Sequence, residues 1–173
     1  MADTSNAGGN GGEPAPAAPQ GQQQPGIHVL GQYIKDLSFE NPGAPRSLRQ
    51  SDKQTQLEVN VNVNAKPQSQ SDFEIELKID ARAVRGDETL FIVDVTYAGL
   101  FQLRGVPPEH VQPLVLIECP RLLFPFARQI VADATRQGGF PPLMIDPVDF
   151  TALYRRRMQE AGAQAQPQTT PPS

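Results

Sequence analysis

The residues of this chain that could do chemistry are few and lie far apart in the sequence. There is one cysteine, Cys119, and there are two histidines, His28 and His110. Cys119 precedes a predicted helix and stands two residues from Arg121, and both features lower the pKa of a thiol. A cysteine nucleophile also needs a base, and neither histidine stands at a spacing that assigns one. We therefore predict that Cys119 is a small buried apolar residue, with a nucleophile as the alternative.

Motifs for catalysis or metal binding are absent from the sequence. It contains no H-E-x-x-H, no paired cysteines, no phosphate-binding loop and no G-x-S-x-G. Asp36 and Glu40 share a predicted strand face, but at ~3.3 Å per residue they stand about 13 Å apart, too far for paired acid–base work. These two carboxylates fit a solvated strand face or an acidic docking surface. We expect no catalytic residue, no cofactor and no metal.

Composition and charge narrow the class of protein. The 173 residues suggest one domain, and the net charge of −4 argues against binding nucleic acid, which depends on Lys and Arg. The basic cluster 155–157 falls in the last turns of a predicted helix, where cations suit the helix dipole. A single cysteine suits a reducing compartment, and neither a secretory signal nor an apolar run of roughly 18 to 20 residues is present. We predict a soluble cytoplasmic protein.

Three segments differ in composition. Residues 1–26 are rich in Gly, Ala, Pro and Gln without apolar periodicity, so they cannot bury enough surface to offset ordering and are predicted to be disordered. Residues 162–173 are similar. Residues 27–161 remain as the folded domain, which is long enough to bury a core.

Apolar and polar residues alternate along four segments before Gly105. A period of two predicts strands with one face on a core and one in water, as in antiparallel sheets. The fourth segment is apolar on both faces near Ile92, as in central or interface strands, and Gly99 is predicted to mark a bulge or bend. The predicted strands are 27–40, 57–64, 73–83 and 89–103, with a hairpin turn at 85–88. In the first strand, Tyr33, Lys35, Leu37 and Phe39 are expected on one face, with Ile34, Asp36, Ser38 and Glu40 on the other.

A long helix is predicted at 119–137. Pro120 at its start and Gly138 after its end are the expected boundary signals. Its apolar stripe is wider than packing on one sheet requires, so one face is expected to contact its own sheet and the other a neighbouring subunit.

Two further helices flank this long one. A weak helix is predicted at 109–118, and a last helix is predicted to begin at Pro147 with Asp146 as its N-cap. The order β-β-β-β-α-α predicts an α+β domain, in which a four-stranded antiparallel sheet carries helices on one face. The apolar stripe of the last helix is Phe150, Leu153, Tyr154 and Met158.

Several of these segments resemble, in the same order, the SecB family of bacterial protein-export chaperones. Residues 33–45 (YIKDLSFENPGAP) resemble the family's first strand and loop, and residues 119–128 (CPRLLFPFAR) resemble its helix signature. Shorter matches lie at 86–89, 138–142 and 147–150. The resemblance covers about 27–161, although many relatives carry a Trp before the second strand and this chain has none.

The resemblance implies an ATP-independent holding chaperone. Such a protein binds unfolded secretory precursors, keeps them translocation-competent and delivers them to the SecA motor ATPase, without catalysis or cofactor. The resemblance also implies a homotetramer, a dimer of dimers with its long helices between the dimers, and no nucleic-acid partner or membrane insertion.

The same resemblance assigns residues to three surfaces. By similarity, a basic, zinc-containing tail of SecA would contact Asp36, Glu40, Ile92 and Asp94. The client would contact Tyr33, Leu57, Val59, Val61, Phe150 and Leu153, for each of which ordinary core packing is the alternative. Together with the wide helix stripe, the resemblance assigns the oligomer interface to Val93, Val95, Tyr97, Cys119, Leu122, Phe126 and Ile130.

Two other classes of protein remain as alternatives. One is a small α+β enzyme of hot-dog-like shape that uses Cys119 or a carboxylate. The other is a purely structural oligomerisation subunit, which would share the tetramer but would not bind unfolded chains.

Overall fold

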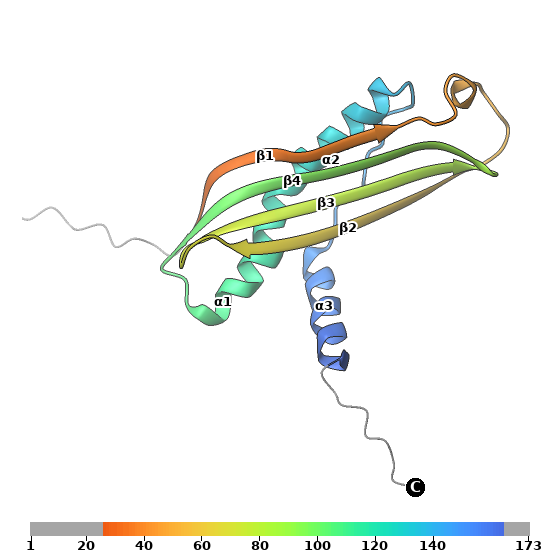
Figure 1. The fold of residues 1–173 in the computed structure, drawn as a ribbon. Coiled ribbons are helices and arrows are strands. Elements are labelled where there is room, and N and C mark those ends of the chain that lie inside the picture. Colours follow the sequence, from red (N-terminus) through yellow and green to blue (C-terminus); the bar gives the residue numbers. More distant parts are fainter. Residues whose placement is uncertain (1–25, 165–173) are drawn as a thin grey trace, which may run out of the picture.

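Four strands form one antiparallel sheet in a computed structural model that describes residues 26–164 (Figure 1). The predicted tails therefore lie almost wholly outside the described residues. The order of the strands in the sheet is β1-β4-β3-β2, so β1 and β2 are its edges. The prediction of a four-stranded antiparallel sheet is confirmed. The strands are β1 (Gly26–Glu40), β2 (Thr55–Pro67), β3 (Asp72–Arg85) and β4 (Glu88–Arg104).

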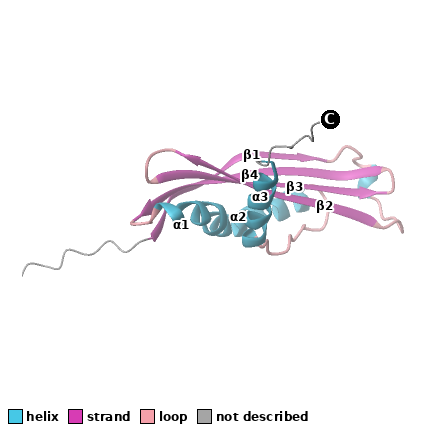
Figure 2. Ribbon diagram, turned by 90° about the horizontal axis from the view of Figure 1, so that it is seen from below, coloured by secondary structure: helices cyan, strands magenta, loops and turns pink. Residues whose placement is uncertain are grey.

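The helices cover one face of this sheet. Figure 2 shows α1 (Pro108–Pro113) and α2 (Cys119–Gln137) on the same side, joined by the π-helical turn η2 (Leu114–Glu118). The last helix, α3 (Phe150–Gln164), extends beyond the β2 edge (Figure 1). A short 3-10 turn, η1 (Arg46–Leu48), lies in the loop between β1 and β2. Within residues 26–164, no helix is both long and apolar enough to cross a membrane.

The core lies between α2 and the two central strands. From Ile75 to Ala83 in β3 and from Phe91 to Leu103 in β4, the odd-numbered residues face the helix, and all of them except Tyr97 are buried. From α2, the side chains of Leu123, Ala127 and Val131 complete this layer. Burial of a continuous apolar layer is the main stabilising contribution to such a domain.

Gly99 allows α2 to approach the sheet closely. A Cβ atom at this position would lie 2.7 Å from Cε2 of Phe101 and 2.9 Å from Cδ2 of Leu123. Both pairings of β4 run through Gly99 without a register shift, so no bulge lies there. A glycine inside a strand can equally mark a close backbone approach, and that is its role here.

The pairing of β3 with β4 shifts only near the hairpin, between Ala83 and Val84, and the other bulges lie in β1. Its pairing with β4 shifts between Val29 and Gly31, and again between Ile34 and Asp36. A bulge places one extra residue in one strand, so the side chains beyond it change face. The predicted faces of the first strand are therefore right from Asp36 to Glu40 and wrong for Tyr33 and Ile34. Ile34 lies with Leu37 and Phe39 on the helix side, whereas Tyr33 lies with Asp36 on the other side.

The last helix begins later than predicted. It starts at Phe150, and Oδ1 of Asp149 caps it by accepting a hydrogen bond from the Ala152 N–H at 3.0 Å. The preceding segment is held against the core, because Ile145 is buried and the Leu143 N–H donates to Oγ1 of Thr135 at 2.9 Å. The predicted N-cap at Asp146 is therefore wrong. The helix runs to Gln164, past the expected end of the domain at residue 161.

The Gly99→Ala variant is expected to be less stable than the wild type. The added methyl group would overlap two fully buried side chains, Phe101 and Leu123, and overpacking of this kind costs about 1–3 kcal/mol. Urea unfolding followed by circular dichroism measures the change. The matched control is Gly31→Ala, because a Cβ at Gly31 meets nothing within 4 Å. Equal stabilities of the two variants would contradict the close approach of α2.

Candidate binding surfaces

The sheet face opposite the helices, here called the open face, carries the residues that were assigned to the SecA motor. Glu40 pairs with Ile92, and Ser38 pairs with Asp94. Asp36 lies two residues before Ser38, so it projects on the same face. We call Asp36, Glu40, Ile92 and Asp94 the acidic patch, and the structure brings these four residues together across β1 and β4.

Asp80 extends the acidic patch onto β3, where sequence reasoning missed it. It pairs directly with Asp94 in the β3–β4 register. Nζ of Lys78 lies 3.1 Å from Oδ1 of Asp80 and 3.4 Å from Oδ1 of Asp94. Burial and a hydrogen bond with Asp94 raise the pKa of the Asp80 carboxyl, and the same hydrogen bond lowers the pKa of Asp94. One lysine thus faces two carboxylates, which leaves this part of the patch acidic.

A network of charges ties β1 to β3 and β2 on the same face. Nζ of Lys35 donates to Glu74 and Glu76, and Nζ of Lys66 donates to Oε1 of Glu76 at 2.7 Å. The Tyr33 hydroxyl donates to Oε1 of Glu74 at 2.6 Å, and this bond raises the pKa of Tyr33. Tyr33 was assigned to client binding, but it lies across the sheet from the other assigned client residues. The structure does not bring Tyr33 together with them.

Acid is expected to weaken the fold through Glu76. Its hydrogen bonds from Lys35 and Lys66 lower the pKa of its carboxyl to about 2. Because the pKa of Glu76 is lower in the folded chain than its unfolded value of 4.5, the ionised carboxylate stabilises the fold at pH values above 4.5. This stabilisation is lost as the pH falls towards 2. Solvent screening reduces it to about 1 kcal/mol.

Urea unfolding at pH 6 and at pH 2.5 measures this contribution. The Glu76→Gln variant is expected to be less stable than the wild type at pH 6 and to differ little from it at pH 2.5. A difference between the two proteins that does not change with pH would exclude Glu76 as the source.

Most of the assigned client residues face the helix side at the β2 edge. Leu57, Val59 and Val61 pair with buried residues of β3, and Leu57 is exposed while the two valines are half-buried. Leu153 of α3 is also half-buried. Phe150 is only 1% exposed and packs edge-to-face on Phe124, so it belongs to the core and its side chain is not available to a client.

A groove that the sequence did not predict runs between β2 and α3. It consists of two cavities of about 320 and 280 Å³. Leu116 and Arg157 border both cavities, and Leu153 and Tyr154 line the larger one. No periodic signal marks Arg157, which the sequence shows only as one of three consecutive arginines. We call this feature the β2–α3 groove.

A second apolar surface lies between β1 and α2 at the opposite edge of the sheet. Leu122 and Phe126 of α2 are 46% and 51% exposed, and Ile130 is half-buried. The Tyr97 ring stacks on Phe126 with centroids 6.1 Å apart, and Ile34 borders the same hollow. These residues present a continuous apolar area, which we call the β1–α2 surface.

Three residues assigned to the oligomer interface do not belong to this surface. Val93, Val95 and Cys119 are fully buried within the single chain, so their side chains cannot contact a neighbouring subunit. Burial, and to a lesser extent the charge of Glu118, raises the pKa of the Cys119 thiol to about 12. Since the thiolate is the nucleophile, the features that would activate Cys119 are outweighed, and the enzyme alternative loses its cysteine candidate.

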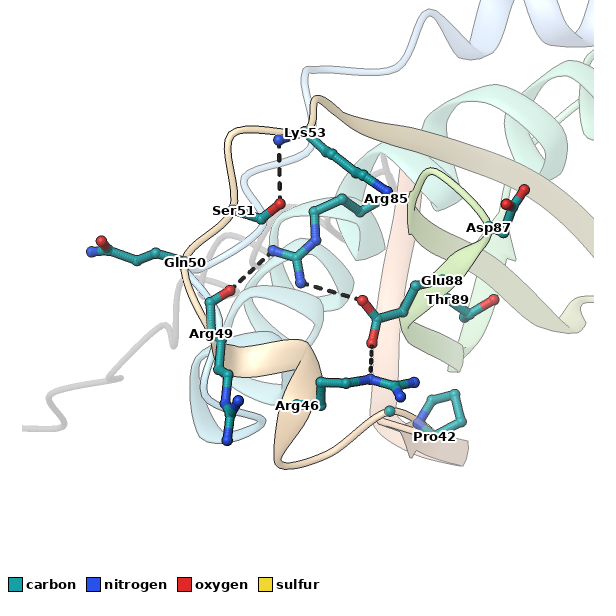
Figure 3. A pocket seen from close by; sticks show the side chains of 11 residues that line it. Pro42, Arg46, Arg49, Gln50, Ser51, Lys53, Arg85, Asp87, Glu88 and Thr89 are labelled. Atoms are coloured by element: carbon teal, nitrogen blue, oxygen red, sulfur yellow. Dashed lines mark hydrogen bonds and ion pairs between the residues drawn. The ribbon is translucent and has the colours of Figure 1, made fainter.

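A basic pocket of about 740 Å³ lies beside the loop that follows β1 (Figure 3). Arg85 donates to the carbonyl oxygens of Ser47 at 3.0 Å and Arg49 at 3.2 Å. Glu88 accepts from Nε of Arg46 at 3.2 Å and lies 3.5 Å from Nη2 of Arg85. These contacts fasten the loop to the β3–β4 hairpin, so the pocket is explained by its structural role.

Comparison with known proteins gives consistent similarities. The family profile described as preprotein translocase subunit SecB matches residues 20–161. The protein-export protein SecB of Rhizobium meliloti (strain 1021) is 57% identical over 145 residues, which cover 84% of this chain and 86% of that protein. The protein-export protein SecB of Agrobacterium fabrum (strain C58) is 55% identical over 152 residues, which cover 88% and 95%.

One solved structure shares the fold. It is the Mycobacterium tuberculosis Rv1957 SecB-like chaperone in complex with a ChAD peptide from the Rv1956 HigA1 antitoxin. The TM-score is 0.55 at 19% sequence identity, and the match covers 70% of this chain and 90% of that one.

Proposed function

Because the chain belongs to the SecB family of protein-export chaperones, we propose that it is an ATP-independent holding chaperone for unfolded secretory precursors. It keeps these precursors translocation-competent in the cytoplasm and delivers them to the SecA motor ATPase. It acts as a homotetramer, a dimer of dimers, and needs no cofactor.

The observation that carries this proposal is the placement of two different surfaces on opposite faces of one sheet. The β2–α3 groove, with Leu116, Leu153 and Tyr154 in its lining, lies at the β2 edge beside α3, and the acidic patch lies on the open face of β1 and β4. A client and a motor can therefore be bound at the same time without competing for area. Simultaneous binding is what delivery requires.

Apolar area is the basis of client binding in this proposal. Clients share no sequence, so recognition depends on apolar surface and on main-chain contacts. Burying about 1,000 Å² of apolar client surface gives roughly 25 kcal/mol gross, much of which is offset by ordering the client. A client that folds hides this surface and is released. The peptide bound to the Mycobacterium SecB-like chaperone supports a polypeptide as the kind of ligand.

Charge is the basis of motor docking in this proposal. The carboxylates of the acidic patch, with Asp80 beside them, lie on the open face near the apolar side chain of Ile92, whose partner in β3 is Arg82. A basic segment of the motor would be steered to this surface and held there by ion pairs. The acidic net charge of the whole chain acts in the same direction.

Light scattering of an unfolded precursor tests the holding activity. A slow-folding secretory precursor is diluted from denaturant into buffer without ATP, with and without this protein. Suppression of aggregation near one tetramer per precursor is expected. The Leu57→Asp variant, with a charge on an exposed apolar residue of β2, should suppress less. Unchanged aggregation at excess wild-type protein would refute the proposed function.

A further inference from the structure

The outer edge of β2 pairs with no other strand within residues 26–164. Among the described strands, β2 pairs only with β3, in a continuous register from Thr55↔Arg85 to Pro67↔Phe73. Half of the backbone N–H and C=O groups of an edge strand point away from the sheet. A bare edge of this length is the feature that binds an extended polypeptide as an added strand.

Arg157 of α3 occupies this edge at one point. Its Nη1 donates to the backbone carbonyl of Val63 at 2.8 Å, across 94 positions of sequence. Arg157 borders both cavities of the β2–α3 groove, so its side chain stands between them. Glu160 is the one acidic side chain that lines the groove, and it pairs with the neighbouring Arg156 at 3.8 Å. Arg157 is therefore the cation of the groove that does not pair with Glu160.

We propose that Arg157 is a latch on the β2 edge, and that an extended client segment opens it by pairing with β2. In the closed arrangement, the guanidinium holds a carbonyl oxygen that the incoming strand needs. When the segment binds, its N–H replaces the guanidinium at Val63, and the two cavities join into one groove. This inference rests on the proposed holding function.

The two sides of β2 define the segment that fits. On the helix side, the edge is bordered by apolar residues of the groove such as Leu116, Leu153 and Tyr154. On the open face, β2 presents Asn60, Asn62 and Asn64, all exposed. Successive side chains of a strand point to opposite faces. The segment selected is therefore extended and uncharged, with apolar and polar residues in alternation.

Fluorescence anisotropy with a labelled ten-residue peptide that alternates Leu and Ser tests the latch. The Arg157→Met variant keeps an unbranched apolar stem but lacks the guanidinium, and it should bind this peptide about three- to tenfold more tightly than the wild type. The matched control is Arg155→Met, which makes the same charge change on the same helix and should bind like the wild type. Circular dichroism verifies that α3 is retained.

A second peptide separates backbone pairing from apolar contact alone. It has the same sequence, with the amide nitrogens on its pairing edge methylated, so it cannot form a strand ladder. It should bind at least about tenfold more weakly, and the difference between wild type and Arg157→Met should vanish. Equal binding of both peptides, or binding by Arg157→Met that is no tighter than wild type, would overturn the latch.

The failure of this inference is distinguishable from the failure of the proposed function. The latch alone is refuted if the wild-type protein suppresses precursor aggregation, but neither the Arg157→Met substitution nor methylation of the peptide changes the peptide affinity. A wild-type protein that neither suppresses aggregation nor binds the unmodified peptide refutes both.

Discussion

The Phe126→Asp variant is expected to break the proposed tetramer into smaller species. Phe126 is half exposed on the β1–α2 surface and stacks on Tyr97. Moving this ring out of a subunit contact loses about 2 kcal/mol of apolar burial, and burying a carboxylate there costs several kcal/mol more. In a symmetric interface the same residue contributes from both subunits, so the loss is counted twice.

Light scattering coupled to size-exclusion chromatography measures the mass. The wild type is expected at the mass of four chains of 18.8 kDa, and Phe126→Asp at two chains or one. The control is Met144→Asp, which places the same charge on an exposed apolar residue outside α2 and β1. Because Phe126 is exposed in the single chain, the stability of each subunit should change little. A variant that keeps the wild-type mass would remove the β1–α2 surface from the interface.

Reversing one charge of the acidic patch is expected to weaken motor docking by about 10- to 100-fold. Asp36 is the suitable residue, because it is exposed and none of the described side chains hydrogen-bonds to it. The Asp36→Lys variant should therefore fold normally while it repels a basic segment. Titration calorimetry with the SecA motor measures the affinity, and a repeat at higher salt should show a weaker salt dependence than that of the wild type.

Client binding provides an internal check on this variant. Asp36 lies on the open face and the β2–α3 groove lies on the helix side, so Asp36→Lys should suppress precursor aggregation as well as the wild type does. Asp52→Lys, which makes the same charge change in the exposed loop before β2, should leave both activities intact. Motor affinity that survives Asp36→Lys would locate docking elsewhere.

Periodicity predicted the elements of this fold but not the faces of its first strand. The alternation in β2, β3 and β4 identified all three strands, because β2 pairs without interruption and the one register shift between β3 and β4, at Ala83/Val84, lies at the end of the pair. In β1, the extra residue between Ile34 and Asp36 moves Tyr33 to the open face. The sequence does not reveal this change, because its apolar residues continue to alternate at odd positions. A bulge is set by the neighbouring strand, so one strand's pattern does not reveal it.

The site residues show a similar limit. A resemblance to known sequences placed four residues on one acidic patch, and the register brings them together. An apolar stripe, however, does not say which chain covers it. Val95 and Phe126 belong to the same predicted interface, yet the first is fully buried by its own α2 and the second is exposed. Asp80 was missed because its partner Asp94 is near it only in the folded sheet.

The bare edge of β2 also has a consequence for the protein itself. The opposite edge, β1, is interrupted by two bulges, a common device that keeps a strand from pairing with other molecules. β2 has no such interruption along its register with β3. The same edge on a second copy is an equally good partner, so an unprotected β2 would let two copies pair edge to edge. The contact that fastens α3 at Val63 would then hinder this self-pairing as well as client binding.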